Sequence, residues 1–340
     1  MTEKILVTGG AGFIGSHTTL ALLEVGLEVV VLDNLSNSSD IALRRVEDIC
    51  GKSLTFIEGD IRNSQILDDL FNEHRISAVL HFAGLKAVGQ SVRMPLNYYD
   101  NNVVGSISLF NAMARAGVFN LVFSSSATVY GEPTQMPISE DFPTGIPTNP
   151  YGRSKLMVED VLRDLSLSDP RWSVGLLRYF NPVGAHESGI IGEDPNGIPN
   201  NLLPYVSQVA IGKLKHLSVF GNDYPTPDGT GVRDYIHVQD LADGHLCALQ
   251  KILQTNGVNI WNLGTGIGYS VLEIIRAFEE ASGRAVPYQV VERRSGDIAQ
   301  CWAAPEKATR ELGWSAKRNL LDMMTDTWRW QLGNPQGYGH

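Results

Sequence analysis

The sequence predicts an α/β protein, with a doubly wound parallel sheet followed by a smaller α/β domain. In the first half of the 340-residue chain, short β-branched segments alternate with helix-length amphipathic segments. This alternation is typical of βαβ units whose helices cover both faces of a parallel sheet. After about Asn181 the alternation ends, and Gly and Pro become dense through residues 192–204. We therefore expect one domain over residues 1–180 and a second over 181–340, with some later segments returning to the first.

Each element of the first domain can be placed from its composition. The expected strands are Lys4–Thr8, 28–32, Thr55–Glu58, 78–82, 121–125 and 173–177, and the helices between them include 14–25, Ser64–Glu73 and 96–116. Ser64 is the expected N-cap of the second of these helices, because its hydroxyl can accept from a backbone N–H of the first turn. Val232–His237 and 259–263 also have the composition of strands and are candidates to rejoin the first sheet.

Composition and charge exclude several classes of function. A formal net charge of −10 argues against a general nucleic-acid binder, which needs a basic face. Cys50, Cys247 and Cys301 are far apart and odd in number, so we expect a reducing compartment and no metal site. No apolar stretch approaches the roughly 20 residues that span a bilayer, and the early first strand leaves no room for a signal peptide. We expect a cytoplasmic protein that binds neither nucleic acid nor membrane.

The first strand leads into a glycine-rich loop that opens the first helix. The loop is Gly9-Gly10-Ala11-Gly12-Phe13-Ile14-Gly15, with the spacing G-x-x-G-x-x-G. Such glycines let the backbone approach a pyrophosphate, and the helix N-terminus adds N–H donors and a favourable dipole, which together indicate a Rossmann-type dinucleotide site. A second cluster, Gly264-Thr265-Gly266-Ile267-Gly268, has no acidic strand end at the right distance after it. There we predict a turn into a helix capped by Ser270.

An acidic residue ends the second strand. Asp33, followed by Asn34, is placed to accept hydrogen bonds from both ribose hydroxyls of a dinucleotide and would repel a 2′-phosphate, so NAD is favoured over NADP. The alternative is that Asp33 only caps the next element. Asp60 and Ile61, at the end of the third strand, are the expected contacts for adenine, although a strand-end Asp is as often structural.

Tyr151 and Lys155 are four residues apart and lie on one face of a predicted helix. A cation beside a phenol favours the phenolate, so Lys155 is expected to activate Tyr151 as a base near neutral pH. Such pairs are common by chance, but the fifth strand ends in hydroxyls at the same sheet edge as the glycine loop. A hydroxyl of Ser124 or Ser126 is then available to bind the oxygen whose proton Tyr151 removes. A base, a cation and a hydroxyl donor next to a nicotinamide together predict hydride transfer between an alcohol and a ketone.

These motifs together resemble the extended short-chain dehydrogenase/reductase superfamily. Longer segments resemble one of its families, the UDP-glucose (UDP-galactose) 4-epimerases: HFAGLKAVG (81–89), YYDNNV (98–103), SSSATVY (124–130), LRYFNPVGA (177–185) and DGTGVRDYIH (228–237). The 4,6-dehydratase relatives carry an Asp-Glu pair after the hydroxyl that ends the strand. Here Ala127 and Thr128 follow Ser126, so no acid stands ready to eliminate water.

The resemblance implies further site residues, each at a position that matches the family pattern. Contacts to NAD are implied for Phe82, Ala83, Lys86, Asn101, Ser124, Tyr151, Lys155 and Tyr179. Contacts to a UDP-hexose are implied for Ser126, Tyr151, Asn181, Asn201, Leu202, Phe220, Arg233, Arg294, Asp297 and Cys301. The chemistry agrees at the two arginines, whose planar forks suit a diphosphate.

The activity implied by the resemblance is UDP-glucose/UDP-galactose 4-epimerisation with tightly bound NAD and a transient 4-keto sugar, in a homodimer. Tyr151 would be the base, Ser126 the hydroxyl donor and Lys155 the activating cation. The small Cys301, at the wall of the hexose pocket, extends the expected substrates to UDP-N-acetylhexosamines. Two alternatives remain, a net dehydrogenase of the same fold and a non-enzymatic NAD-sensing module. The second has no need for Ser126, Tyr151 and Lys155 together.

Overall fold

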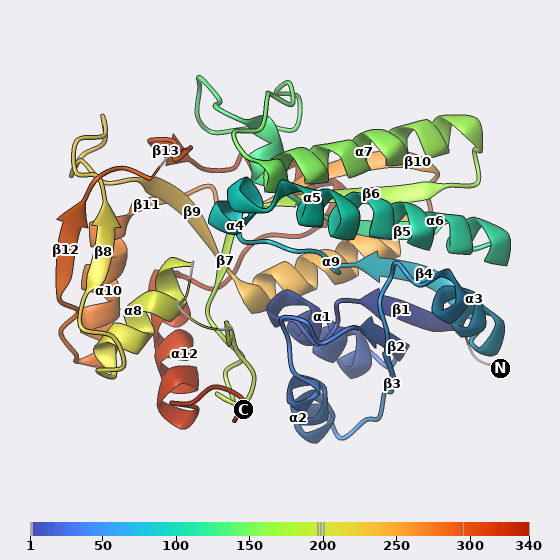
Figure 1. Cartoon of the computed structure of the whole chain (residues 1–340), viewed down its shortest axis with the longest axis horizontal. Helices are drawn as coiled ribbons and strands as arrows, with labels where there is room; N and C mark the ends of the chain where they lie inside the picture. Colours follow the sequence, from blue (N-terminus) through green and yellow to red (C-terminus); the bar gives the residue numbers. More distant parts are fainter. Residues whose placement is uncertain (1–2, 196, 198, 200, 295, 340) are drawn as a thin grey trace.

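The computed structural model describes residues 3–339, with the exception of 196, 198, 200 and 295. It contains a larger and a smaller α/β part, which lie side by side (Figure 1). The large sheet is entirely parallel, with the strand order β10-β6-β5-β4-β1-β2-β3. Its strands are β1 (Lys4–Thr8), β2 (Glu28–Asp33), β3 (Thr55–Glu58), β4 (Ile76–His81), β5 (Asn120–Ser126), β6 (Ser173–Tyr179) and β10 (Gly257–Leu263). The predicted doubly wound α/β fold is confirmed.

Helices cover both faces of this sheet and form two apolar cores with it. One face carries α1 (Phe13–Glu24), α2 (Asp40–Cys50), α9 (Val238–Ile252) and α11 (Glu306–Leu312). The other carries α3 (Ser64–Glu73), α6 (Gly105–Ala116) and α7 (Pro150–Ser168), with the short α4 (Val88–Arg93), α5 (Pro95–Tyr98), a π-helical turn (Tyr99–Val104) and a 3-10 turn (Ala127–Tyr130) near the sheet edge. Within the described part of the chain, no helix combines the length and apolar character needed to cross a membrane.

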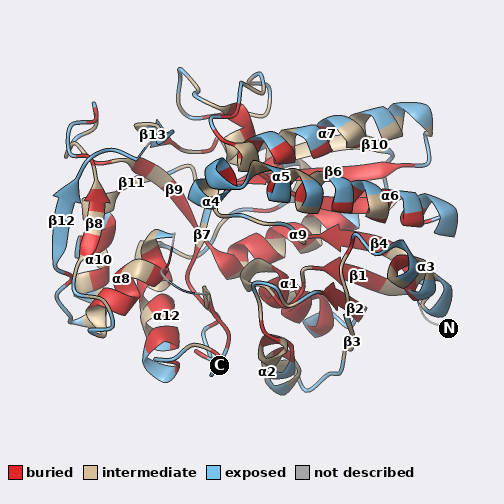
Figure 2. Cartoon of the chain, in the orientation of Figure 1, coloured by how far each residue is buried: buried red, intermediate tan, exposed pale blue. Residues whose placement is uncertain are grey.

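The smaller part of the molecule is built on two short sheets. A four-stranded sheet joins β7 (Asn181–Val183), β9 (Val232–His237), β11 (Gly268–Ser270) and β13 (Gln300–Cys301), and a two-stranded sheet pairs β8 (Leu217–Phe220) with β12 (Tyr288–Val291). The helices α8 (Leu202–Ala210), α10 (Val271–Ser282) and α12 (Leu320–Gly333) pack against them around a third apolar core. Figure 2 shows the burial concentrated on the inner faces of these elements.

The element positions expected from the sequence agree closely with the structure, with three differences. Residues 259–263 join the large sheet as part of β10, whereas Val232–His237 forms β9 of the small sheet. The N-cap of α3 is Asn63, whose side chain accepts from the N–H groups of Gln65 and Ile66, so the assignment of Ser64 was wrong by one position. The segment 96–116 is interrupted by the π-helical turn.

The second glycine cluster folds around a carboxylate of the protein itself. Asp234 on β9 is fully buried, and its carboxylate accepts hydrogen bonds from the backbone N–H of Thr265 at 2.9 Å, of Gly266 at 3.0 Å and of Ala303 at 3.1 Å. Ser270 then caps α10 in a capping box with Glu273. The predicted turn and cap are confirmed.

A buried ion pair fixes α7 to the large sheet. Arg178 on β6 donates to Glu159 on α7 through Nε at 2.9 Å and Nη2 at 2.6 Å, and both side chains are at most 1% exposed. Ser125 on β5 donates to the same carboxylate. Burial alone would raise the pKa of Glu159, but its hydrogen bonds to Arg178 lower the pKa below the ordinary value. Because α7 also carries Tyr151 and Lys155, this pair supports the helix that positions them.

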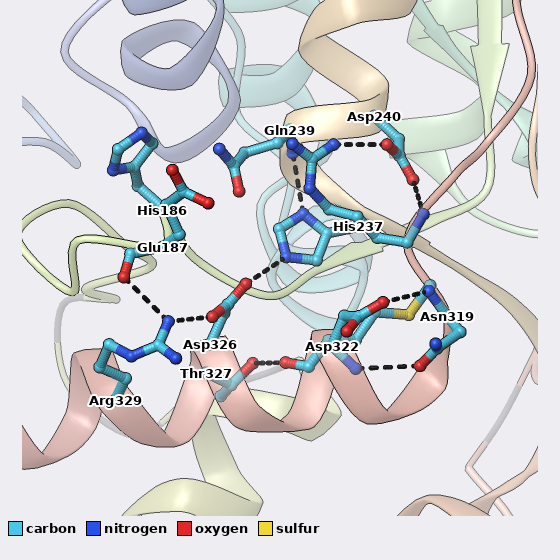
Figure 3. Close-up of polar contacts among 12 residues, drawn as sticks. His186, Glu187, His237, Gln239, Asp240, Asn319, Asp322, Asp326, Thr327 and Arg329 are labelled. Atoms are coloured by element: carbon cyan, nitrogen blue, oxygen red, sulfur yellow. Dashed lines mark hydrogen bonds and ion pairs between the residues drawn. The ribbon is translucent and has the colours of Figure 1, made fainter. Parts of the chain in front are cut away.

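Polar contacts anchor α12 to the small sheet and to the segment that follows β7 (Figure 3). His237 at the end of β9 contacts Asp326 on α12, with 3.2 Å between Nε2 and Oδ2. Arg329, on the same helix, pairs with Asp326 and donates to the backbone carbonyl of Glu187 at 2.9 Å. Helix α12 is therefore held beside the segment 186–195, of which 192–195 border the cavity described next.

Candidate active site

One cavity opens at the carboxyl edge of the large sheet, where the loops after β1, β2, β4 and β5 meet α7 and the segment 192–195. Nearly the whole predicted set of cofactor contacts lines it: Gly9, Gly12, Phe13, Ile14, Gly15, Asp33, Asn34, Ile61, Phe82, Ala83, Lys86, Asn101, Ser124, Tyr151, Lys155 and Tyr179. Of that set, only Asp60 lies outside the described lining. The cavity is thus formed by residues far apart in the sequence.

The glycines of the first loop have different roles. Gly9 has a φ of +72°, and a Cβ there would lie 2.6 Å from the backbone nitrogen of Ala83. A Cβ on Gly15 would lie 2.2 Å from the carbonyl oxygen of Gly9. These two positions need glycine for packing. Gly12, by contrast, has open space beyond one 3.3 Å contact, and it precedes the first turn of α1. The helix N-terminus therefore remains accessible from the cavity, as binding of a pyrophosphate requires.

Asp33 is buried at the cavity wall and organises both neighbouring loops. Its carboxylate accepts from the backbone N–H of Ala11 at 3.0 Å and of Leu35 at 2.9 Å, and from the Ser38 hydroxyl at 2.8 Å. Ser39, not Asp33, caps α2. The alternative in which Asp33 merely caps the next helix is therefore wrong, although the residue does hold the glycine loop in place.

Asp60 is held by its own neighbours. Its carboxylate accepts from the guanidinium of Arg62 at 2.7 and 2.9 Å and from the amide of Asn34 at 2.8 Å. The hydrogen bonds from Arg62 hold the pKa of Asp60 well below its usual value. Ile61 and Gly59, on either side of Asp60, line the cavity. These bonds brace the end of β3, and the contact of Asp60 with adenine stays a prediction.

The base–cation pair is present at the start of α7, which begins at Pro150 with Asn149 as N-cap. Lys155 is buried, and its Nζ donates to the backbone carbonyl of Ser124 at 2.7 Å. Burial lowers the pKa of Lys155 to about 8. The pKa of Tyr151 is raised by burial, against which a hydrogen bond with Ser126 acts. The pKa of Tyr151 is thus raised and not lowered as expected from Lys155, because burial dominates.

The two candidate serines differ in their partners. The Ser124 hydroxyl contacts the phenol of Tyr179, whose pKa is raised by burial. The Ser126 hydroxyl accepts two hydrogen bonds from Thr128, one from the backbone N–H at 3.2 Å and one from the hydroxyl at 3.0 Å. A hydrogen bond with Ser126 also acts to lower the pKa of Tyr151. Because Thr128 uses its acceptor positions, the Ser126 hydroxyl can still donate its proton, and in the free protein it donates toward Tyr151.

Several residues at the cavity were not found from the sequence, among them Glu193 and Tyr338. Glu193 accepts from Lys86 Nζ at 2.8 Å and from Asn201 Nδ2 at 2.7 Å through the same oxygen, Oε1. It thereby joins a predicted cofactor contact to a predicted substrate contact. Tyr338, near the end of the chain, also lines the cavity. Neither lies in a motif, and the only signal for Glu193 was its place in the Gly- and Pro-dense region.

The remaining predicted substrate residues lie on the small sheets and nearby loops. Cys301 on β13 is in register with Arg233 on β9, and β9 also pairs with β7, where Asn181 lies. The guanidinium of Arg294 lies over the ring of Phe220 at 4.3 Å from its centroid, and the backbone N–H of Asp297 donates to the Arg294 carbonyl at 3.2 Å. Asn201 and Leu202 lie at the start of α8.

Cys301 is 9% exposed and packs in an apolar cluster that includes Tyr130 and Phe180. Burial raises the pKa of its thiol to about 12. Among the described residues, no group of three or more His, Cys, Asp or Glu side chains is arranged to hold a metal ion.

Comparison with known proteins agrees with this geometry. Residues 6–327 match the family model described as GDP-mannose 4,6 dehydratase. The chain is 64% identical over 334 residues to UDP-glucose 4-epimerase of Bacillus subtilis, covering 98% of each chain. It is similar to the crystal structure of UDP-glucose 4-epimerase from Bifidobacterium longum in complex with NAD+ and UDP, with a TM-score of 0.96, 54% identity, and 98% and 99% of the two chains covered. The enzyme from Stenotrophomonas maltophila, with bound NAD and formylated UDP-arabinopyranose, gives a TM-score of 0.96 at 51% identity, with 98% and 99% covered.

Proposed function

We propose that this chain, which belongs to the UDP-glucose 4-epimerase family, interconverts UDP-glucose and UDP-galactose with NAD that stays bound. The observation that carries the proposal is that one cavity is bordered by the open N-terminus of α1, the buried Asp33 and the Tyr151–Lys155 pair. These groups match, in order, a pyrophosphate, a ribose diol and the site of proton transfer.

The residues present fit NAD. Gly12 leaves the helix N-terminus accessible for the pyrophosphate, Asp33 offers carboxylate oxygens to a ribose, and Lys155 and Tyr179 border the part of the cavity beside Tyr151. When bound, NAD would accept the hydride from C4 of the sugar and return it, and its positive charge would favour the phenolate of Tyr151. That charge supplies what the free protein lacks, since burial raises the pKa of Tyr151.

The side chains of the protein handle the proton. Tyr151 takes the proton of the sugar 4-hydroxyl and later gives it back, as a general base and then a general acid. Ser126 donates a hydrogen bond to the same sugar oxygen, which its bonds from Thr128 leave it free to do. Lys155, fixed by the Ser124 carbonyl, keeps a positive charge beside the site below about pH 8.

Epimerisation further requires that the 4-keto sugar present its other face before it is reduced. This demands a firm hold on the nucleotide and a loose hold on the hexose. Arg233 and Arg294 offer guanidinium groups to the diphosphate, and Asp297 offers a carboxylate to the ribose. The elements that carry these residues lie apart from the loops that line the dinucleotide cavity. This arrangement supports a division between a part that holds UDP and a part that holds NAD.

The test is incubation of the purified protein with UDP-galactose and no added NAD. UDP-glucose should form without accumulation of free NADH. A net dehydrogenase would need added NAD and would release NADH with each turnover, and a sensing module would form no product. A 4,6-dehydratase would form a 4-keto-6-deoxy sugar, but Ala127 and Thr128 follow Ser126 where that chemistry needs an acid.

Asp33→Ala tests the cofactor assignment. Loss of the carboxylate should lower the amount of NAD that co-purifies and reduce the preference for NAD over NADP, because the group that repels a 2′-phosphate is gone. Bound nucleotide released on denaturation and titration with each dinucleotide measure both effects. Ser39→Ala, which removes the α2 cap but not the carboxylate, is the control for loop disturbance. Equal NAD content and preference in wild type and Asp33→Ala would assign Asp33 a structural role only.

Cys301 carries the proposal on substrate range. A small side chain at the hexose wall leaves room for an N-acetyl group at the sugar 2-position, so UDP-N-acetylglucosamine and UDP-N-acetylgalactosamine should also be interconverted. Cys301→Tyr should abolish the acetylated reaction and spare the plain one, because the phenol fills that volume. Cys301→Ala is the matched control and should keep both reactions. Turnover of UDP-galactose by the wild type with none of the acetylated sugars would show that Cys301 only packs in its apolar cluster.

The homodimer is also a proposal. Along α4, α5 and the turn before α6, the apolar residues Val92, Leu96 and Val104 are 62%, 78% and 49% exposed. Such a patch on a helical surface is typical of an interface between subunits. Analytical ultracentrifugation should give twice the chain mass for wild type, and Leu96→Lys should shift the equilibrium toward the monomer.

A further inference from the structure

We infer that Tyr338 is a positioning residue for the dinucleotide cavity, and that through it the C-terminal segment 334–339 sets how long NAD stays bound. The inference rests on the proposed function, because it takes the cavity to hold NAD. It concerns a part of the chain that contributes to none of the motifs of the site. Tyr338 acts by fixing the segment 192–194, which forms one wall of the cavity.

Tyr338 and Trp330 bind this wall at three successive residues, two through the backbone and one through a side chain. The Tyr338 hydroxyl accepts from the N–H of Gly192 at 3.2 Å and donates to the Gly192 carbonyl at 3.1 Å. Trp330 Nε1 donates to the Glu193 carbonyl at 3.2 Å. The backbone N–H of Tyr338 donates to the Asp194 carboxylate at 2.8 Å. The wall therefore depends on contacts from a segment about 145 residues away in sequence.

The contact is closely packed. Tyr338 is 7% exposed, and its ring lies 4.9 Å from that of Trp330. A Cβ on Gly192 would lie 2.4 Å from the Trp330 ring, and one on Gly337 would lie 2.1 Å from the Asp194 carboxylate. Side chains larger than hydrogen are excluded at both glycines without a shift of the wall. The segment around Tyr338 is therefore packed into the wall and does not merely lie on its surface.

Arg45 ties the same contact to the first half of the molecule. Its guanidinium lies over the rings of Tyr338 at 5.1 Å and Trp330 at 5.8 Å, and Nη1 donates to Asn334 at 2.6 Å and to the Ile190 carbonyl at 2.9 Å. Arg45 lies on α2, which directly follows the loop 36–39 that also lines the cavity. The C-terminal segment thus bridges two walls, one from each half of the molecule (Figure 1).

The position of the wall matters inside the cavity because of Glu193. With its backbone fixed by Trp330, its Oε1 accepts from both Lys86 and Asn201. Lys86 lines the cavity, and Asn201 immediately precedes α8. A displaced wall would move Glu193 and release Lys86, while opening the side of the cavity next to Tyr338. Loss of the Tyr338 contacts should therefore speed the escape of NAD more than it disturbs proton transfer at Tyr151.

The experiment compares the holoenzyme of wild type, Tyr338→Phe, Gln336→Ala and a chain that ends at Pro335. Tyr338→Phe keeps the ring on Trp330 and removes only the hydroxyl. Gln336 is exposed in the same segment and serves as the matched control. Exchange of bound NAD for isotopically labelled NAD gives the release rate, measured well below the thermal midpoint of each variant, and initial rates give kcat and KM for UDP-galactose.

The expected result is NAD release about tenfold faster in Tyr338→Phe and faster still in the shortened chain. The kcat of Tyr338→Phe in saturating NAD should stay close to wild type. Gln336→Ala should release NAD at the wild-type rate. The thermal midpoint of Tyr338→Phe need not change for this result, which separates positioning from general stability. Release from Tyr338→Phe at the wild-type rate would overturn the inference even if the shortened chain fails to fold. A wild type that holds no NAD at all would instead overturn the proposed function.

Discussion

Replacing Tyr151 with Phe is expected to lower turnover of UDP-galactose by at least about 100-fold, the usual contribution of a general acid–base group. The ring stays and the phenol is lost, so the 4-hydroxyl proton has no acceptor. NAD content should be unchanged, because the contacts expected to hold it come from the glycine loop, Asp33 and Lys155. The measurement is the initial rate with saturating UDP-galactose, together with bound nucleotide per chain.

Tyr288→Phe controls for the substitution itself, since Tyr288 lies exposed on β12. It should be indistinguishable from wild type. Near-normal turnover in Tyr151→Phe would mean that another group accepts the proton. A large loss of NAD in the same variant would mean that Tyr151 serves binding and not chemistry.

Glu159→Gln should produce the largest change in stability among the substitutions considered. It leaves the Arg178 guanidinium buried without its counter-charge, and Nη1 of that side chain already has no hydrogen-bond partner. Removal of one member of a buried pair costs about 3–5 kcal/mol in the free energy of unfolding. Chemical denaturation of matched preparations measures the shift in midpoint.

Asp160→Asn is the matched control, because Asp160 is the next residue on α7 and its side chain is 64% exposed in a pair with Arg163. A surface pair of this kind contributes at most about 1 kcal/mol. Combining Glu159→Gln with Arg178→Met should recover much of the loss, since the uncompensated charge is removed. Equal midpoints for Glu159→Gln and Asp160→Asn would show that the buried pair adds no net stability.

Local patterns predicted the parts of the site that are local in sequence. The loop from Gly9 to Gly15 and the acidic end of β2 depend on a strand followed by a turn and a helix, so spacing alone was enough to place them. The setting of Asp60 is also local. Arg62 stands two residues further on and captures the carboxylate, and a basic residue at that distance was visible in the sequence.

Other features depend on contacts that leave no periodic or spaced signal. Tyr338 reaches the segment 192–194, which contains Glu193, because α12 docks on the small sheet. Nothing in the sequence around Glu193 or Tyr338 indicates this contact. The predicted direction of the Tyr151 pKa shift was wrong for a different reason. The i,i+4 spacing correctly put Lys155 on the same helix, but spacing says nothing about how deeply the phenol is buried, and burial decides its sign.

The return of β10 to the edge of the large sheet has a consequence for biosynthesis. Strand β6 is complete at Tyr179, but the strand that covers its outer edge does not begin until Gly257. On the ribosome, the first six strands emerge well before their last partner, and the unpaired edge of β6 is a template for association with other nascent chains. A prematurely terminated chain that stops before Gly257 would keep that edge exposed, so we expect such fragments to aggregate or to be degraded.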